Sequence, residues 1–344
     1  MKTKNVICIL IAMVVSFSVQ LVSAKEVSIT VEKDLGAVSS ESTEYFSYKS
    51  DSTKAMTDMQ INDMAEKLMA YTNSSSRLEE AKMEKIDGRI FMGGREKHPS
   101  TAYLDIDPTI QSLIFSKEME KYFGEGDTKG LPDRADAPKL AEIHLETLAL
   151  LPEDFKAEMT LLHVGGVGMA TINEDGFVAD YEKLVTVIYG RTLDGLPVKG
   201  ASRIAVRMGI NGELVGLVRN WPELNKKTVS SKDMIASRSR IDHLKRHLGS
   251  LYDDSKVEAV SITDANIVMY DDGRGTIEPA MFVLGEITQK DGFEEHADWI
   301  VPLLRSPRAR YSILERVPVY PDNHKVEQSQ GIKDSIIEED DFDK

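Results

Sequence analysis

The chain has 344 residues, of which 41% are hydrophobic and 29% are charged, and its formal net charge is −15. This composition is typical of a soluble globular protein and excludes a chain that is disordered throughout. The acidic balance gives no electrostatic footprint for nucleic acid, and it argues against a surface that binds anionic lipid. The length allows one large domain or two to three small ones.

Residues 1–24 have the pattern of an export signal. Lys2 and Lys4 precede an almost unbroken apolar run from Val6 to Val15, and the small residues Ser23-Ala24 fit a cleavage site. The run is shorter than the about 20 apolar residues that cross a membrane, so a cleaved signal is favoured over an N-terminal anchor. We therefore predict an exported protein, periplasmic or secreted, with no membrane span after cleavage.

The cysteine content of the chain excludes several kinds of site. The single cysteine, Cys8, lies within the predicted signal. The mature chain is therefore expected to have no disulfide framework, no cysteine nucleophile and no cysteine-based zinc site.

The N-terminal part of the mature chain begins with a leader and continues into a first predicted unit. Residues 25–54 are rich in Ser, Thr, Glu and Lys, and we expect a mobile leader with one short strand at Val27–Val31. Apolar residues at helical spacing predict a helix over Met56–Tyr71. Extended runs at Ala102–Ile106 and Ser112–Phe115 then predict a hairpin, which completes an α+β unit over residues 55–123.

Two more units follow a candidate linker. Residues 124–137 are rich in Gly, Pro and Asp, and we interpret them as the linker. A helix from Pro138 to Leu151 opens a second unit over 138–226. A helix from Ser230 to Gly249 and three strand-like runs, at 257–269, 277–287 and 299–304, make a third unit over 227–324. Residues 325–344 are acidic and predicted to be disordered. The predicted fold class is α+β, with successive small units of a helix packed on an antiparallel sheet.

The stretch from Leu184 to Trp221 has the clearest local pattern. In its middle strand Ile204, Val206 and Met208 fall on one side, while Arg203 and Arg207 fall on the other. The pair at 211–212 is Asn-Gly, which predicts a two-residue type I′ hairpin turn because both residues take positive φ. One face of this hairpin is therefore expected to be buried and the other wet.

The same stretch resembles the PepSY and the fungalysin/thermolysin-propeptide-like families of exported bacterial proteins. The resemblance rests on Tyr189-Gly190-Arg191, on the loop Gly195–Gly200 and on Asn211-Gly212-Glu213, and a later hairpin at residues 265–283 extends it to about residues 180–288. It implies a PepSY-like α+β fold and a non-catalytic module that binds or inhibits peptidases or assists their folding. No peptidase domain follows, so we do not expect a propeptide role in cis.

Candidate chemistry elsewhere in the chain is weak. His243 and His247 share a helix face at i and i+4, but Leu244 stands where a zinc-peptidase motif needs glutamate, so solvated histidines are favoured over a metal site. Residues 165–170 lack the spacing of a phosphate-binding loop, and a glycine-rich strand or loop is favoured. Asp271–Gly275 is interpreted as a hairpin turn and not as a calcium loop. We predict no catalytic, cofactor-binding or metal-ligating residue.

Arginines supply the one functional hypothesis. If Arg191, Arg203, Arg207 and Arg219 lie on the wet side of one hairpin, they form a basic patch that can dock an acidic partner. Scattered solubilising charges are the alternative. The predicted role is an exported, non-catalytic binding or regulatory protein that acts on another envelope or secreted protein, with a peptidase as one candidate partner. An exported hydrolase, metal-dependent through His243 and His247, and a structural envelope component are the alternatives.

Overall fold

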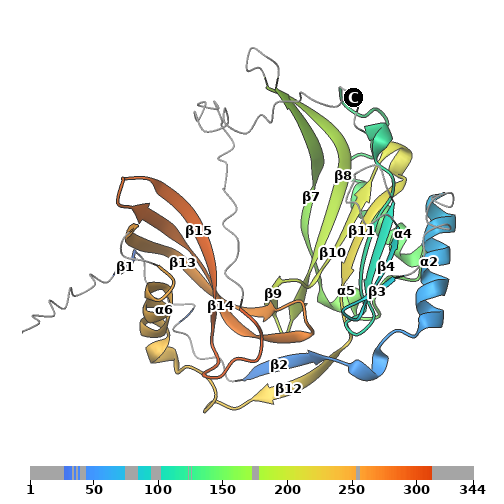
Figure 1. Ribbon diagram of the computed structural model, residues 1–344. Coiled ribbons are helices and arrows are strands. Elements are labelled where there is room, and N and C mark those ends of the chain that lie inside the picture. Colours follow the sequence, from blue (N-terminus) through green and yellow to red (C-terminus); the bar gives the residue numbers. More distant parts are fainter. Residues whose placement is uncertain are drawn as a thin grey trace, which may run out of the picture.

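The computed structural model describes residues 27–32, 35, 38, 44–73, 84–93, 102–122, 124, 126–172, 178–252 and 256–311. The predicted signal at 1–24 and the predicted acidic tail at 325–344 lie outside these residues. Within them no helix has the length and apolar character needed to cross a membrane. Two sheets stand opposite one another and give the molecule a U-shaped outline (Figure 1).

The N-terminal lobe is a large antiparallel sheet. Its strands lie in the order β3, β4, β5, β6, β11, β10, β8, β7, and each neighbouring pair is antiparallel. Their bounds are β3 Glu84–Ile86, β4 Arg89–Gly93, β5 Tyr103–Asp107, β6 Ser112–Ser116, β7 Met159–Ile172, β8 Val178–Leu193, β10 Arg203–Met208 and β11 Leu214–Asn220. The long β7–β8 hairpin rises at the inner side of the U (Figure 1).

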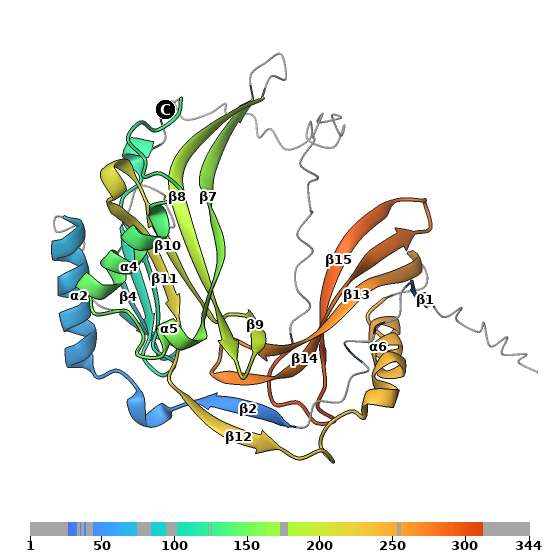
Figure 2. The ribbon, with the colours of Figure 1, turned by 180° about the vertical axis from the view of Figure 1, so that it is seen from behind.

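Helices cover one face of this sheet. Helix α2 (Asp58–Thr72) begins with a capping box between Thr57 and Gln60 and ends at Asn73, whose left-handed backbone terminates it. Helix α4 (Ala137–Thr147) and the short α5 (Phe155–Glu158) pack beside it. Their apolar side chains meet the strands in one core that includes Ile61, Leu68, Leu145, Phe155, Val187, Tyr189, Ile204, Val206 and Trp221. The opposite face of the sheet carries no α-helix of the described residues, and we call it the open face (Figure 2). The 3-10 turn Glu120–Tyr122 packs there, with Tyr122 against Leu184 and Val215.

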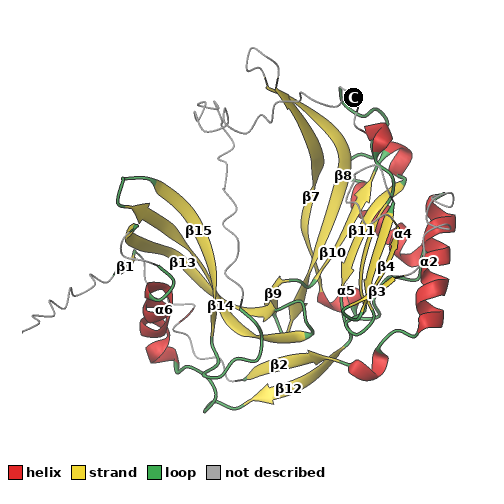
Figure 3. Cartoon of the chain, in the orientation of Figure 1, coloured by secondary structure: helices red, strands yellow, loops and turns green. Residues whose placement is uncertain are grey.

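The C-terminal lobe is a smaller sheet with one helix. Strand β1 (Ser28–Val31) runs parallel to β13 (Val257–Asp271), which pairs antiparallel with β14 (Thr276–Gln289), and β15 (Glu294–Pro302) lies beyond β14. Helix α6 (Arg240–Gly249) covers the outer face. Leu244 and Leu248 of α6 belong to the same core as Val260, Met281 and Trp299. Helices therefore lie on the outside of both lobes (Figure 3).

Three further strands join the lobes. Strand β2 (Tyr45–Ser50) lies between β12 (Leu224–Val229) and the start of β14, and β9 (Leu196–Gly200) pairs with β8 on one side and with β13 on the other. Short 3-10 turns lie at Ser52–Lys54, Glu120–Tyr122, Ile210–Gly212 and Ser237–Ser239. The strand pairing is thus continuous from one lobe to the other.

The α+β fold class is confirmed, but the predicted division into units differs from the structure. Strand β6 of the first predicted unit pairs with β11 of the second, and both units share one core. Residues 124–137 therefore connect parts of one lobe. Because hydrophobic patterning reports a buried face and not its partner strand, it cannot tell two small sheets from one large sheet.

Three local predictions also change. The expected leader contains β2, which joins the two lobes. The third helix begins at Arg240 and not at Ser230, because Met234 forms a strand bridge with Leu304. Asn211 and Gly212 have the expected positive φ of 55° and 73°, but they lie in a longer loop, closed by a hydrogen bond from the Gly209 amide to the Glu213 carbonyl.

Candidate functional site

Strand register sorts the four candidate arginines into two pairs. Arg203 lies opposite Gly190 in the β10–β8 ladder, so Arg191, one residue further along β8, points to the other face. Arg219 lies opposite Ile204, a core residue of the helix-covered face. The prediction of one shared wet face is therefore wrong for Arg191 and Arg219 and holds for Arg203 and Arg207.

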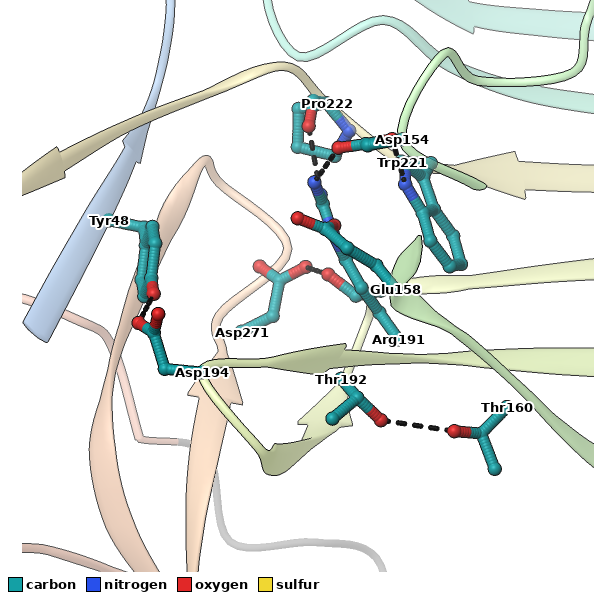
Figure 4. A network of polar contacts seen from close by, with 11 residues as sticks. Tyr48, Asp154, Glu158, Thr160, Arg191, Thr192, Asp194, Trp221, Pro222 and Asp271 are labelled. Carbon is teal, nitrogen blue, oxygen red and sulfur yellow. Dashed lines mark hydrogen bonds and ion pairs between the residues drawn. The ribbon is translucent and has the colours of Figure 1, made fainter. Parts of the chain in front are cut away.

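Arg191 is the centre of a buried polar network. Its side chain is 1% exposed, and its guanidinium bonds Glu158 at 2.5 Å and Asp154 at 2.8 Å and donates to the Pro222 carbonyl at 2.9 Å. It also lies over the Trp221 ring, whose Nε1 donates to Asp154 (Figure 4). Burial raises the pKa of Glu158, while the charge of Arg191 opposes that shift. All of these contacts hold α5 to the end of the sheet, which is a structural role.

Polar contacts close to this network fix the junction between the lobes. Ser202 Oγ donates to Asp271 Oδ2 at 2.6 Å, and Tyr48 of β2 donates to Asp194 in the β8–β9 turn (Figure 4). Burial raises the pKa of Asp271, and the hydrogen bonds from Ser202 and Gly273 oppose it. The amide of Gly273 bonds the Asp271 side chain, as a hairpin turn requires.

Arg203 and Arg207 lie exposed on the open face. Neither guanidinium makes a hydrogen bond or ion pair with any residue that the structure describes. Gly216 of β11 lies opposite Arg207, and Ile188 and Val218 lie opposite Ala205, so this part of the face mixes cationic and apolar groups. Two unpaired cations in a chain of net charge −15 can meet an acidic partner.

The outer edge of β7 lies beside this face and has an unusual composition. Its 14 residues include no Lys, Arg, Asp, Glu or Pro. Leu161 is 45% exposed, Leu162 62% and Val167 36%, and β7 pairs with β8 alone among the described strands. Register irregularities flank a continuous run from His163 to Val167. The sequence pattern predicted a glycine-rich strand or loop here, and the structure has a strand.

The other free edges among the described strands are protected. Strand β15 carries Glu294, Glu295 and Asp298 and ends in Pro302, and β12 carries Lys226 and Lys227. Strands β1 and β3 have only four and three residues. Charge, proline and shortness are three of the ways in which proteins prevent edge-to-edge pairing, and β7 has none of the three. Its two register irregularities leave the run from His163 to Val167 regularly paired with β8. Sequence reasoning missed this edge, although the uncharged run was its signal.

The two histidines on α6 stand close together on one side of the helix. Their ring centroids are 6.2 Å apart, and His243 Nε2 contacts the Pro302 carbonyl at 3.0 Å. Burial lowers the pKa of both, and the proximity of His243 lowers that of His247 further. In the described part of the chain, no group of three potential metal ligands gathers around them.

Comparisons with known proteins give distant structural likenesses. No protein-family model matches the chain, and no curated protein matches it. An uncharacterized protein from Eubacterium rectale is similar with a TM-score of 0.37 and 11% identity, over 78% of this chain and 86% of that one. The Bacillus megaterium YpeB C-terminal domain is similar with a TM-score of 0.31 and 10% identity, over 73% of this chain and 95% of that one. Likenesses at this level carry no argument about function, and the PepSY-like resemblance stays a prediction.

Proposed function

We propose that this chain is an exported, non-catalytic binding or regulatory protein that docks a segment of another envelope or secreted protein on the open face and the β7 edge. The observation that carries the proposal is the long, uncharged edge of β7, left exposed beside two unpaired arginines. Export rests on the signal-like pattern of residues 1–24.

The backbone of β7 provides the means of binding. An edge strand presents unpaired N–H and C=O groups, and an extended peptide can pair with them as an added strand. The continuous register from His163 to Val167 is long enough to fix such a strand. Exposed Leu162 and Val167 then supply apolar contact to the partner.

Charge selects the partner. Strand β10, which carries Arg203 and Arg207, lies two strand spacings, about 10 Å, from β7. A partner that pairs with the edge of β7 can therefore cover both arginines with the rest of its surface if it also contacts the open face. Acidic side chains on that body meet the two guanidinium groups, which favours fast, salt-dependent association. The PepSY-like resemblance makes a peptidase the first class of partner to examine.

The test is site-specific photo-crosslinking in cells that produce the full chain. A photoreactive phenylalanine replaces Val167 on β7 or, as the matched control, Glu294 at the edge of β15. We expect one specific adduct from position 167, none from position 294, and loss of the adduct when Arg203→Glu and Arg207→Glu are combined. Equal adducts from both positions, or none from position 167, contradict the proposal.

A further inference from the structure

A separate cleft opens on the helix-covered side of the N-terminal sheet. It has a volume of about 630 Å³ and lies between the start of α2, the loop that follows α4 and strands β6 and β11. Its lining includes Met56, Met64, Leu113, Leu148, Leu150 and Arg219. Because this side faces away from Arg203 and Arg207, the cleft is distinct from the docking surface proposed above.

Arg219 is the residue around which the cleft is built. It lies directly opposite Leu113 in the β11–β6 ladder, and its Nε and Nη1 donate to the carbonyls of Leu150 at 2.9 Å and Gln111 at 3.0 Å. Among the described residues, Nη2 has no acceptor and no carboxylate forms an ion pair with the guanidinium. Burial lowers the pKa of Arg219 to about 10, so the group stays charged at neutral pH.

The two carbonyls that Arg219 binds belong to turns with left-handed residues. Gln111 has φ 53° and Ala149, which precedes Leu150, has φ 54°, and both line the cleft. Left-handed backbone is uncommon for residues other than glycine and persists where surrounding contacts enforce it. Arg219 supplies such contacts, and Gln111 Nε2 adds a bond to the Lys54 carbonyl at 2.7 Å. The walls of the cleft are therefore held in place before any ligand arrives.

The other charges of the cleft compensate one another. Lys54 pairs with Glu223 at 3.4 Å, and Lys67 pairs with Asp63 at 2.8 Å, with all four side chains more than half exposed. Arg219 is thus the charged lining residue without a direct partner of opposite sign. An arginine with free donors in a partly apolar cleft is suited to an anion that carries an apolar group.

We propose that this cleft binds a small organic carboxylate with an apolar body. The carboxylate accepts hydrogen bonds from the free donors of Arg219, an arrangement that the planar guanidinium favours. The apolar body packs against Met56, Met64 and Leu148.

Calorimetric titration of the purified protein tests this inference with four probes. Octanoate and 4-phenylbutyrate are the acids, and octanamide and 4-phenylbutanamide are their neutral counterparts. We expect both acids to bind at least tenfold more tightly than their amides, and Arg219→Gln to weaken the acids about tenfold. Arg238→Gln, which removes the same charge at an exposed position outside both proposed sites, is the control and leaves binding unchanged. Absence of acid binding, or equal binding of acid and amide, overturns the proposal.

A second pair of variants keeps the test decisive if Arg219→Gln does not fold. Lys67→Glu reverses an exposed charge at the cleft, whereas Lys290→Glu makes the same reversal at an exposed position of the C-terminal lobe. We expect Lys67→Glu to weaken octanoate about threefold and Lys290→Glu to have no effect. If the two variants weaken octanoate binding equally, octanoate does not bind in this cleft.

Discussion

The two faces of the N-terminal sheet use the same residue type in opposite ways. On the helix-covered face Arg191 and Arg219 bind carbonyls and carboxylates of the chain itself. On the open face Arg203 and Arg207 bind none of the described residues, though they lie within the same hairpin region. Strand register, and not residue type, therefore decides whether an arginine side chain forms hydrogen bonds with the chain itself.

The largest effect is expected at Arg191. Arg191→Ala removes the cation that Asp154 and Glu158 share and should destabilise the protein by about 3 kcal/mol, the low end for a broken buried ion pair because both carboxylates keep partial contact with water. Urea denaturation measures the loss. A loss no larger than that of Arg203→Ala would show that the two faces do not differ.

Arg219 should follow with a smaller loss. Arg219→Gln removes two hydrogen bonds to turn carbonyls, each with a net value of about 1 kcal/mol, so we expect a loss of about 1–2 kcal/mol. The same denaturation series gives the value. A change near zero would mean that the turns at Gln111 and Ala149 hold their left-handed backbone without Arg219.

The helix-covered face should also depend on pH through His144. His144 of α4 contacts the Gly212 carbonyl at 2.8 Å and the Tyr71 hydroxyl at 2.8 Å, and burial lowers its pKa although the bond to Gly212 opposes the shift. The folded state then binds the proton less readily than the unfolded state. The stability that the neutral His144 side chain contributes is therefore fully present above the His144 pKa of the unfolded chain, about 6.5. It is lost as the pH falls through the lower His144 pKa of the folded protein.

Denaturation midpoints from pH 8 to pH 5 measure this dependence. We expect the wild-type midpoint to fall more steeply toward acid pH than that of His144→Gln. His243 and His247 titrate in both proteins and cancel in the difference. Parallel curves would show that His144 is solvated, and Arg203→Ala serves as a control that leaves the wild-type curve unchanged in shape.

The smallest effect is expected on the open face. Arg203→Ala and Arg207→Ala should each change stability by less than about 0.5 kcal/mol, as is usual for surface substitutions, because both residues are exposed and neither guanidinium makes a hydrogen bond or ion pair with a described residue. Their effect should appear instead in the crosslinking yield from position 167. A stability loss above about 1 kcal/mol would mean that this face packs against another part of the chain.

The sequence predicted which side chains of a single strand share a face, but it did not predict how neighbouring strands pair. The pattern of β10 correctly assigned Ile204 and Val206 to the core and Arg203 and Arg207 to the wet side. Arg191 belongs to another strand, and its face depends on the pairing of Gly190 with Arg203. That pairing is a long-range contact, which local composition does not specify.

Strand β2 illustrates the same limit. Its six residues, YFSYKS, lie in a Ser- and Thr-rich region and offer a weak strand signal. They are ordered by β12 and β14, which follow much later in the chain. Pairing with β12 and β14 therefore makes residues 45–50 a strand, although their local sequence favours an irregular leader segment.

The placement of β1 and β2 has a consequence for the order of folding. Strand β1 pairs with residues 259–262 and β2 with residues 224–229, so each waits for partners that are synthesised about 180 residues or more later. The sheet from β3 to β11 contains no such distant pair and can close first. These pairings then form late, which makes their closure the slow step. Strand β2 stays unpaired until residues 224–229 have been synthesised, and β1 until residues 259–262 have been synthesised.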